Sequence, residues 1–200
     1  MSPLRRELLL GATLLAAPKK PAHKAPEVSP AEDLMREHGL LNRVLLIYEA
    51  CVEKNQAAVL VSAAKIIRDF IESYHEKLEE EFLFPRFEKA GKLADLTATL
   101  RKQHAAGREI TAQLIAGSGL APQLVRKFVR MYRPHEARED TVLFPAFREL
   151  VGEKEYDRLG DKFEDREHQL FGEAGFEGKV AEVARIEEQL GIADLDRFTP

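Results

Sequence analysis

The sequence predicts an all-α protein, an up-down-up-down four-helix bundle with additional C-terminal helices. Apolar residues recur with the period of a helix from residue 30 onwards, and no stretch alternates with the period of two that is typical of a strand. Glycines and prolines divide the chain into segments of helical length. With 200 residues and 44% hydrophobic content, the chain can bury one substantial core.

Residues 1–29 are expected to precede the fold. Arg5-Arg6 is followed by a largely apolar run over 8–17 and then by lysines and prolines, an order typical of a twin-arginine export signal and a Pro/Lys-rich linker. The apolar run spans only about 15 Å as a helix, too short for a bilayer core of roughly 30 Å. We therefore expect a periplasmic or otherwise exported protein, with a cytoplasmic location as the alternative.

The expected bundle covers 30–151 and begins at Ser29. This serine can cap a helix, a proline occupies the first helical position, and Glu32 can close a capping box. The first helix is expected over about 30–54. His38 lies on the same face as the apolar residues of this helix.

The second helix is expected to start with Asn55 as its cap and to continue until Phe84-Pro85 and Gly91 interrupt the apolar pattern. The third helix should cover about 92–116, and it is followed by a loop that contains two glycines.

The fourth helical stretch is expected from Pro122 to about Leu150, and Pro134 and Pro145 predict kinks in it. Residues 152–200 form a C-terminal extension. Its amphipathic segments, at about 154–171 and 178–190, can pack on the outside of the bundle.

An internal repeat carries the chemistry. A motif of thirteen residues that starts at His75 recurs sixty residues later, with seven identical positions. The repeated positions are His75-Glu76-x-x-Glu79-x-x-x-Leu83-Phe84-Pro85-x-Phe87 and His135-Glu136-x-x-Glu139-x-x-x-Leu143-Phe144-Pro145-x-Phe147. One helix before each copy, a single histidine lies on the core face, and these are His38 and His104.

The spacing within this repeat suits a metal site. Residues four apart project from nearly the same side of a helix, so each copy can offer a histidine and a glutamate to one ion. Counting residues outward from the turns, at 1.5 Å per residue, places six groups at one level of the bundle. They are His38, His75, Glu79, His104, His135 and Glu139.

Four imidazoles and two carboxylates buried together would be costly without a cation. Nitrogen and oxygen donors without cysteine suit iron or manganese. Six protein ligands exceed the four of a structural zinc site, which favours a dinuclear centre. A structural hypothesis, in which the histidines bind no metal and the bundle is an interaction module, is the alternative at this point.

In the order and spacing of these residues, the segment 30–150 resembles the hemerythrin HHE cation-binding domain. The resemblance implies two iron ions, bridged by an oxo or hydroxo group, that bind dioxygen or react with related small oxidants. Two positions depart from oxygen-carrying hemerythrins. Arg108 stands where those proteins have a fifth histidine, and Asp140, which matches their aspartate ligand, stands next to Glu139.

We favour Glu139 as the ligand because it repeats the helical phase of Glu79, and Asp140 is the alternative. The missing fifth histidine makes the site more symmetric and richer in oxygen. This favours a protein for redox chemistry or peroxide detoxification. The corresponding enzyme hypothesis is a di-iron catalase or peroxidase-like oxidoreductase. The alternative is a protein that reversibly binds or senses dioxygen or nitric oxide, or that binds iron without turnover.

Several further side chains could support such a centre. Tyr48 and Tyr132 lie on or near inward faces, and Arg108 could pair with Glu79, with Glu139 or with a bound anion. Phe82 and Val142, seven residues after the repeat histidines, are expected to wall the site.

Glu76 and Glu136 are candidate acceptors for imidazole N–H groups, with a solvated surface role as the alternative. His168 lies among acidic neighbours near the C-terminus and could belong to a second metal site, although exposed histidines of this kind are usually only hydrated.

Charge and cysteine content limit the other function classes. The formal net charge is -4 with both signs interspersed, so we expect no nucleic-acid partner. Cys51 is the single cysteine, and no disulfide can form within the chain.

Overall fold

A computed structural model describes residues 28–117 and 119–200, and over these residues it is helical and contains no strand. The expected export signal at Arg5-Arg6, the apolar run over 8–17 and nearly all of the linker lie outside the described residues. Within the described part, no helix is both long and apolar enough to cross a membrane.

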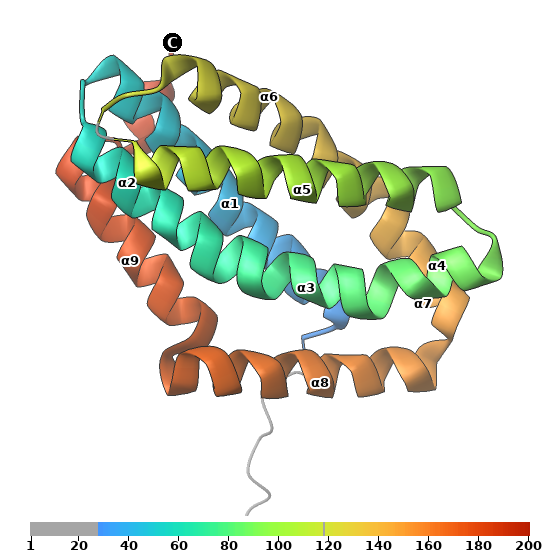
Figure 1. Cartoon of the computed structure of the whole chain (residues 1–200). Helices are drawn as coiled ribbons and strands as arrows, with labels where there is room; N and C mark the ends of the chain where they lie inside the picture. Colours follow the sequence, from blue (N-terminus) through green and yellow to red (C-terminus); the bar gives the residue numbers. More distant parts are fainter. Residues whose placement is uncertain (1–27, 118) are drawn as a thin grey trace, which may run out of the picture.

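Four helical rods form the body of the molecule (Figure 1). Two are single helices, α1 (Pro30–Glu53) and α5 (Ala94–Ala116). The other two contain π-helical turns within longer α-helical rods. They are α2 (Ala57–Ile66), η1 (Ile67–His75), α3 (Glu76–Leu78), η2 (Glu79–Leu83) and α4 (Phe84–Ala90), and then α6 (Pro122–Arg138), η3 (Glu139–Leu143) and α7 (Phe144–Val151).

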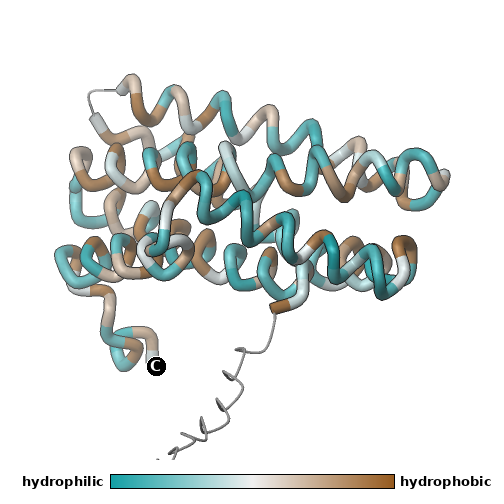
Figure 2. Tube along the Cα trace, turned by 90° about the horizontal axis from the view of Figure 1, so that it is seen from below, coloured by the Kyte–Doolittle hydropathy of each residue, from teal (hydrophilic) through white to brown (hydrophobic). Residues whose placement is uncertain are grey.

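These rods form a helical bundle. Helix α1 contacts α2, η1 and α6, and α5 contacts the same three segments from the other side. Polar and apolar residues are interspersed along each rod (Figure 2), as expected for helices that bury one face and expose the other. The core is rich in phenylalanine and leucine, and it includes the fully buried ring of Phe128.

Two further helices, α8 (Glu153–Phe171) and α9 (Gly175–Leu190), follow the bundle, separated by a short 3₁₀ turn, η4 (Gly172–Ala174). Helix α8 contacts α1 and α7, and α9 runs back along α1 and α2 (Figure 1). A two-pronged ion pair between Arg43 of α1 and Glu187 of α9, at 2.9 and 2.5 Å, fixes α9 to the bundle. A second 3₁₀ turn, η5 (Leu195–Phe198), lies near the C-terminus.

The two helix starts that were predicted from capping residues have different outcomes. Ser29 caps α1 as expected, since its Oγ accepts the Glu32 N–H at 3.3 Å. The prediction that Asn55 caps the second helix is wrong. Asn55 has a left-handed backbone with φ of 57°, and the Gln56 N–H donates to the Cys51 carbonyl at 2.9 Å. Asn55 therefore terminates α1, in the αL position that asparagine tolerates better than most residues.

The repeat prolines do not end their helices. The rod of α2 continues past Pro85 and ends at Gly91, whose φ is 64°, and the fourth rod continues past Pro145. A π-helical turn precedes each proline, so Pro85 and Pro145 fall in the first turn of the next α-helical segment, where a missing N–H is tolerated. Pro134 lies inside α6 without breaking it.

Candidate metal centre

The six residues predicted from the repeat come together in the core of the bundle. They form two groups of four, each within 4.8 Å, and both groups contain Glu79 and Glu139. The first group adds His38 and His75, and the second adds His104 and His135. Each glutamate thus belongs to both groups, which is the arrangement expected of carboxylates that bridge two cations.

Every imidazole of the centre turns its Nε2 towards a carboxylate. The Nε2 atoms of His38 and His135 lie 3.3 and 3.0 Å from Oε2 of Glu139. Those of His75 and His104 lie 3.8 and 3.4 Å from the Glu79 carboxylate oxygens. The centre is therefore nearly symmetric, with two nitrogens directed at each glutamate.

The two glutamates are fully buried, and none of their four carboxylate oxygens has a hydrogen-bond partner. Such groups cost several kcal/mol when they carry charge without a counterion. Burial and then the charge of Glu139 raise the pKa of Glu79 well above its usual range. The donor set of two carboxylates and four imidazoles fits a pair of divalent or trivalent cations, which would neutralise this charge.

π-helical turns coincide with the centre. Segment η1 ends at His75, η2 begins at Glu79, and η3 begins at Glu139. A π-helical turn is wider than an α-helical one and commonly occurs where a helix presents functional side chains. The π-helical turn η3 follows the His135–Glu139 spacing, so these two side chains keep the four-residue α-helical offset that favoured Glu139 over Asp140 in the sequence.

The structure separates these two residues. Glu139 lies in both groups, whereas the Oδ1 of Asp140 lies 2.7 Å from the Nδ1 of His38, on the side of the ring that faces away from the centre. The Asp140 side chain is 34% exposed, in contrast to the full burial of Glu139. Asp140 therefore orients a histidine and belongs to neither group of the centre.

Each of the other three histidines also has an oxygen acceptor at its Nδ1. His75 donates to Glu37 at 2.6 Å, His104 to Glu80 at 3.1 Å, and His135 to Gln103 at 2.9 Å. Such acceptors fix the ring orientation and leave Nε2 as the free donor atom for a metal. The prediction had assigned this role to other glutamates, and it missed these three residues.

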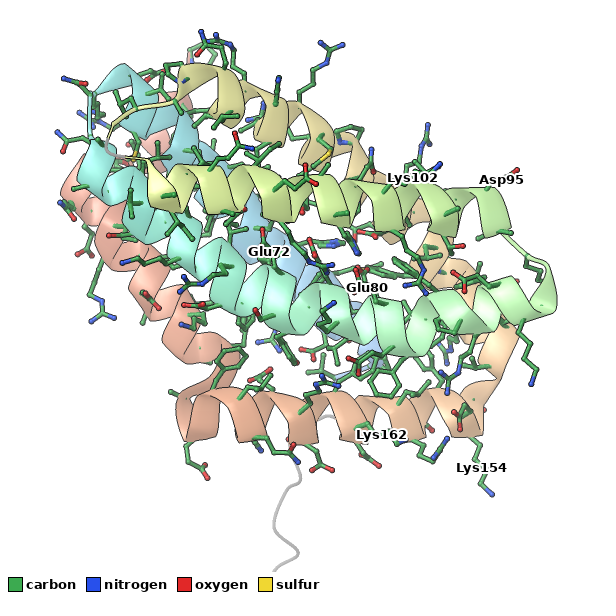
Figure 3. The ribbon with its side chains drawn as sticks, viewed as in Figure 1. Glu72, Glu80, Asp95, Lys102, Lys154 and Lys162 are labelled. Atoms are coloured by element: carbon green, nitrogen blue, oxygen red, sulfur yellow. The ribbon has the colours of Figure 1, made fainter. Side chains whose placement is uncertain are left out.

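A sequence signal for them exists. Each acceptor is next to a residue of the centre but serves a histidine on a neighbouring helix. Glu37 precedes His38 as Gln103 precedes the third-helix histidine, and Glu80 follows Glu79 as Asp140 follows the fourth-helix glutamate. The internal repeat thus extends to the acceptors. Glu80 lies between the second rod and α5 (Figure 3).

Glu76 and Glu136, the predicted imidazole acceptors, have other partners. Glu76 accepts the Tyr132 hydroxyl at 2.6 Å, and Glu136 accepts the side-chain amide of Asn42. Both glutamates are buried, and burial raises the pKa of each to about 8. The solvated surface role that was the alternative for them is also wrong.

Arg108 does not pair with the glutamates of the centre as predicted. Its Nη2 lies 2.6 Å from Glu76 and 2.7 Å from Glu80. The guanidinium therefore supplies the cation for a neighbouring acidic pair that includes the acceptor of His104. Arg108 therefore acts on the centre only indirectly, by holding Glu80, the acceptor of the His104 ring.

Two phenyl rings stack on histidines of the centre. Phe144 lies 5.5 Å from the His38 ring with an interplanar angle of 21°, and Phe84 lies 5.5 Å from the His104 ring at 26°. The prediction had placed Phe82 and Val142 as the wall. Both are half-buried, and Phe82 packs against Phe163 of α8 instead. The rings that do flank the centre are the phenylalanines of the repeat itself.

The remaining candidates lie outside the six-residue centre. Tyr132 packs beside His135, with ring centroids 5.3 Å apart, but its hydroxyl is engaged by Glu76. Tyr48 is fully buried, its ring lies against Phe128, and its hydroxyl has no partner. His168 is exposed on α8, in the lining of a cleft between α1, α8 and α9.

The comparisons with known proteins agree with this geometry. Proteins described as uncharacterized from Mycobacterium tuberculosis and Mycobacterium bovis are 46% identical over 197 residues, which cover 90% of this chain and 77% of those relatives. No solved protein structure matches the chain at a significant level. The model of the family described as Hemerythrin HHE cation binding domain matches residues 29–147. The chain belongs to the hemerythrin HHE cation-binding domain family.

Proposed function

We propose that this protein is a non-haem di-iron protein that reacts with small oxidants, with peroxide detoxification as its main role. The proposed iron ligands are His38, His75, Glu79, His104, His135 and Glu139. One observation carries the proposal: four buried carboxylate oxygens without hydrogen-bond partners lie among four imidazole nitrogens. Manganese suits the same donors and is the alternative metal.

The side chains of this centre have distinct tasks. Glu79 and Glu139 would bridge the two metal positions, because each belongs to both groups of four. The acceptors at each Nδ1 hold the imidazoles in place, so little reorganisation is needed when metal binds. The stacked ring of Phe144 keeps water from a face of His38, and that of Phe84 does the same for His104.

Bound there, two irons would supply redox exchange with peroxide, or binding of dioxygen or nitric oxide. Each position would have two imidazoles and two shared carboxylates, since Arg108 offers no fifth imidazole. The symmetry and the carboxylate content support redox chemistry over reversible oxygen carriage. The alternative function is reversible binding or sensing of dioxygen or nitric oxide.

Activity of the iron-loaded protein tests this function. We expect oxygen evolution from hydrogen peroxide, or peroxidase turnover with a reducing dye, and we expect both to be lost in His135→Ala. Glu149→Ala, a change of an exposed residue on α7, is the matched control and should retain activity. Iron-loaded protein without turnover, but with an absorption band that disappears on deoxygenation, would favour the carrier or sensor.

We further propose that the four rods follow the up-down-up-down order, which is supported by the contacts of α1 and α5 with the same two neighbouring rods. The functional unit is residues 30–151, and residues 152–200 are an extension packed on it. Export through Arg5-Arg6 remains a proposal from the sequence alone. Detection of the protein in the periplasm, and its loss on Arg5→Lys with Arg6→Lys, tests the export proposal.

A further inference from the structure

A cleft of about 550 Å³ lies between the start of α1 and helices α8 and α9. Acidic side chains dominate its lining. Those that are exposed are Asp157, Asp161, Glu164, Glu173 and Glu177. This arrangement gives the cleft a negative potential, which raises the local concentration of cations.

Three carboxylates converge where this cleft meets the core. Asp33 and Glu167 line the cleft and are half-buried, and Glu37 behind them is fully buried. One oxygen from each of the three lies within 4.8 Å of the others. Burial therefore increases from the exposed acids of the cleft, through the half-buried Asp33 and Glu167, to the fully buried Glu37.

Glu37 provides the independent sign of a missing ligand. Its Oε2 is bonded to the Nδ1 of His75 at 2.6 Å, but its buried Oε1 has no hydrogen-bond partner. The hydroxyl of Tyr74 also lies beside Glu37, and it donates to the Phe163 carbonyl at 3.4 Å. A buried carboxylate oxygen without a partner is unfavourable, and a cation would satisfy it.

Arg36, which lines the cleft, divides its charge between Asp33 and an exposed glutamate of α9. Arg36 lies 3.9 Å from Asp33, and its other terminal nitrogen is bonded to Glu177 at 3.0 Å. Burial, and then the charge of Glu167, raise the pKa of Asp33 to about 6. Glu167 accepts the Phe176 N–H at 2.7 Å through one oxygen, which leaves its second oxygen for another ligand.

We propose that Asp33, Glu37 and Glu167 form a second metal site that binds a hard divalent cation through oxygen atoms only. Carboxylate oxygens without nitrogen or sulfur donors suit Mn²⁺, Mg²⁺ or Ca²⁺. The acidic cleft connects this site to solvent, and the Glu37–His75 hydrogen bond connects it to the histidine centre. The second site does not depend on whether that centre binds iron.

Manganese binding to the full-length, iron-loaded protein tests the proposal. Free Mn²⁺ is followed by electron paramagnetic resonance during a titration, and iron is counted in the same samples. We expect one Mn²⁺ per chain beyond the iron. Glu167→Gln should weaken this binding by about tenfold or more, because ligand charge sets the affinity of such sites.

Glu167→Gln preserves an oxygen that can accept the Phe176 N–H, so the fold should survive, and melting checks this. Glu173→Gln, in the same cleft but outside the three carboxylates, is the matched control and should change the affinity by less than about twofold. Asp33→Asn is a second variant and should also weaken binding.

No Mn²⁺ binding beyond the iron, or equal binding in wild type and in both Glu167→Gln and Asp33→Asn, would overturn the second site. Iron content reports on the histidine centre separately. If the histidine centre takes manganese in place of iron, the number of bound Mn²⁺ ions in wild type and in Glu167→Gln still tests the second site. Glu167→Gln should then bind one Mn²⁺ fewer than wild type.

Discussion

Asp140→Ala and Glu139→Ala should have very different effects on iron binding, although the two residues are adjacent. Asp140 touches His38 only at the outer nitrogen and belongs to neither group of the centre. Glu139 is fully buried and belongs to both groups. Asp140→Ala should therefore leave two irons per chain, whereas Glu139→Ala should lose both.

The magnitude for Asp140→Ala follows from the role of the hydrogen bond. Removing the acceptor behind a metal-binding imidazole weakens metal affinity by roughly 10- to 100-fold. This corresponds to about 1.4–2.7 kcal/mol. The effect should be confined to the position held by His38 and His75, because the acceptors of His104 and His135 remain in place.

Competition with a chelator of known affinity measures these changes. Wild type, Asp140→Ala and Glu139→Ala are loaded with iron under the same conditions and titrated, and retained iron is counted. Glu149→Ala, which changes an exposed acid further along the same rod, is the control for charge and should match wild type. Complete iron loss in Asp140→Ala, or two retained irons in Glu139→Ala, would refute the assignment.

Three further predictions concern packing and pH. Gly107→Ala should destabilise the protein by about 1–3 kcal/mol in urea unfolding, because the new Cβ would lie 2.1 Å from the buried Tyr132 hydroxyl. Phe144→Ala should cost about 3–5 kcal/mol in urea unfolding and should speed the release of iron to a chelator, because the ring stacks on His38. Iron should be released on dialysis below about pH 6, because protons then compete for the imidazole nitrogens; full retention at pH 5 would contradict this.

The sequence predicted the helices and the set of converging residues well, because both depend on periodicity. Apolar spacing placed α1 and α5 within two residues of their observed bounds. The internal repeat placed two equivalent histidine–glutamate pairs at one level of the bundle. Turn lengths then sufficed to bring the pairs together, because helices have a fixed rise per residue.

The errors arose where a local rule competed with tertiary structure. Asn55 can cap a helix start or occupy a left-handed helix end, and the observed backbone uses the second option. Phe82 was assigned to the centre from ideal α-helical geometry, but the π-helical turn over 79–83 changes the angular offset. Arg108 was expected to pair with the glutamates of the centre or a bound anion because it stands where related proteins have a histidine ligand, whereas its guanidinium contacts Glu76 and Glu80.

The acceptors behind the histidines were missed for a different reason. Glu37 and Gln103 serve histidines on neighbouring helices, so their role depends on packing between helices and not on helical phase. Their equivalent positions, each directly before a histidine of the centre, could have identified them as acceptors. This signal could be used only after the register between the helices was known.

Metal analysis of the full-length protein, purified without added metal, tests the di-iron centre. We expect about two irons per chain, since both groups share the same two glutamates, and we expect a lower melting temperature after chelation because metal binding stabilises the folded state. A protein without iron or another transition metal, whose melting temperature is unchanged by chelation, would contradict the proposed centre.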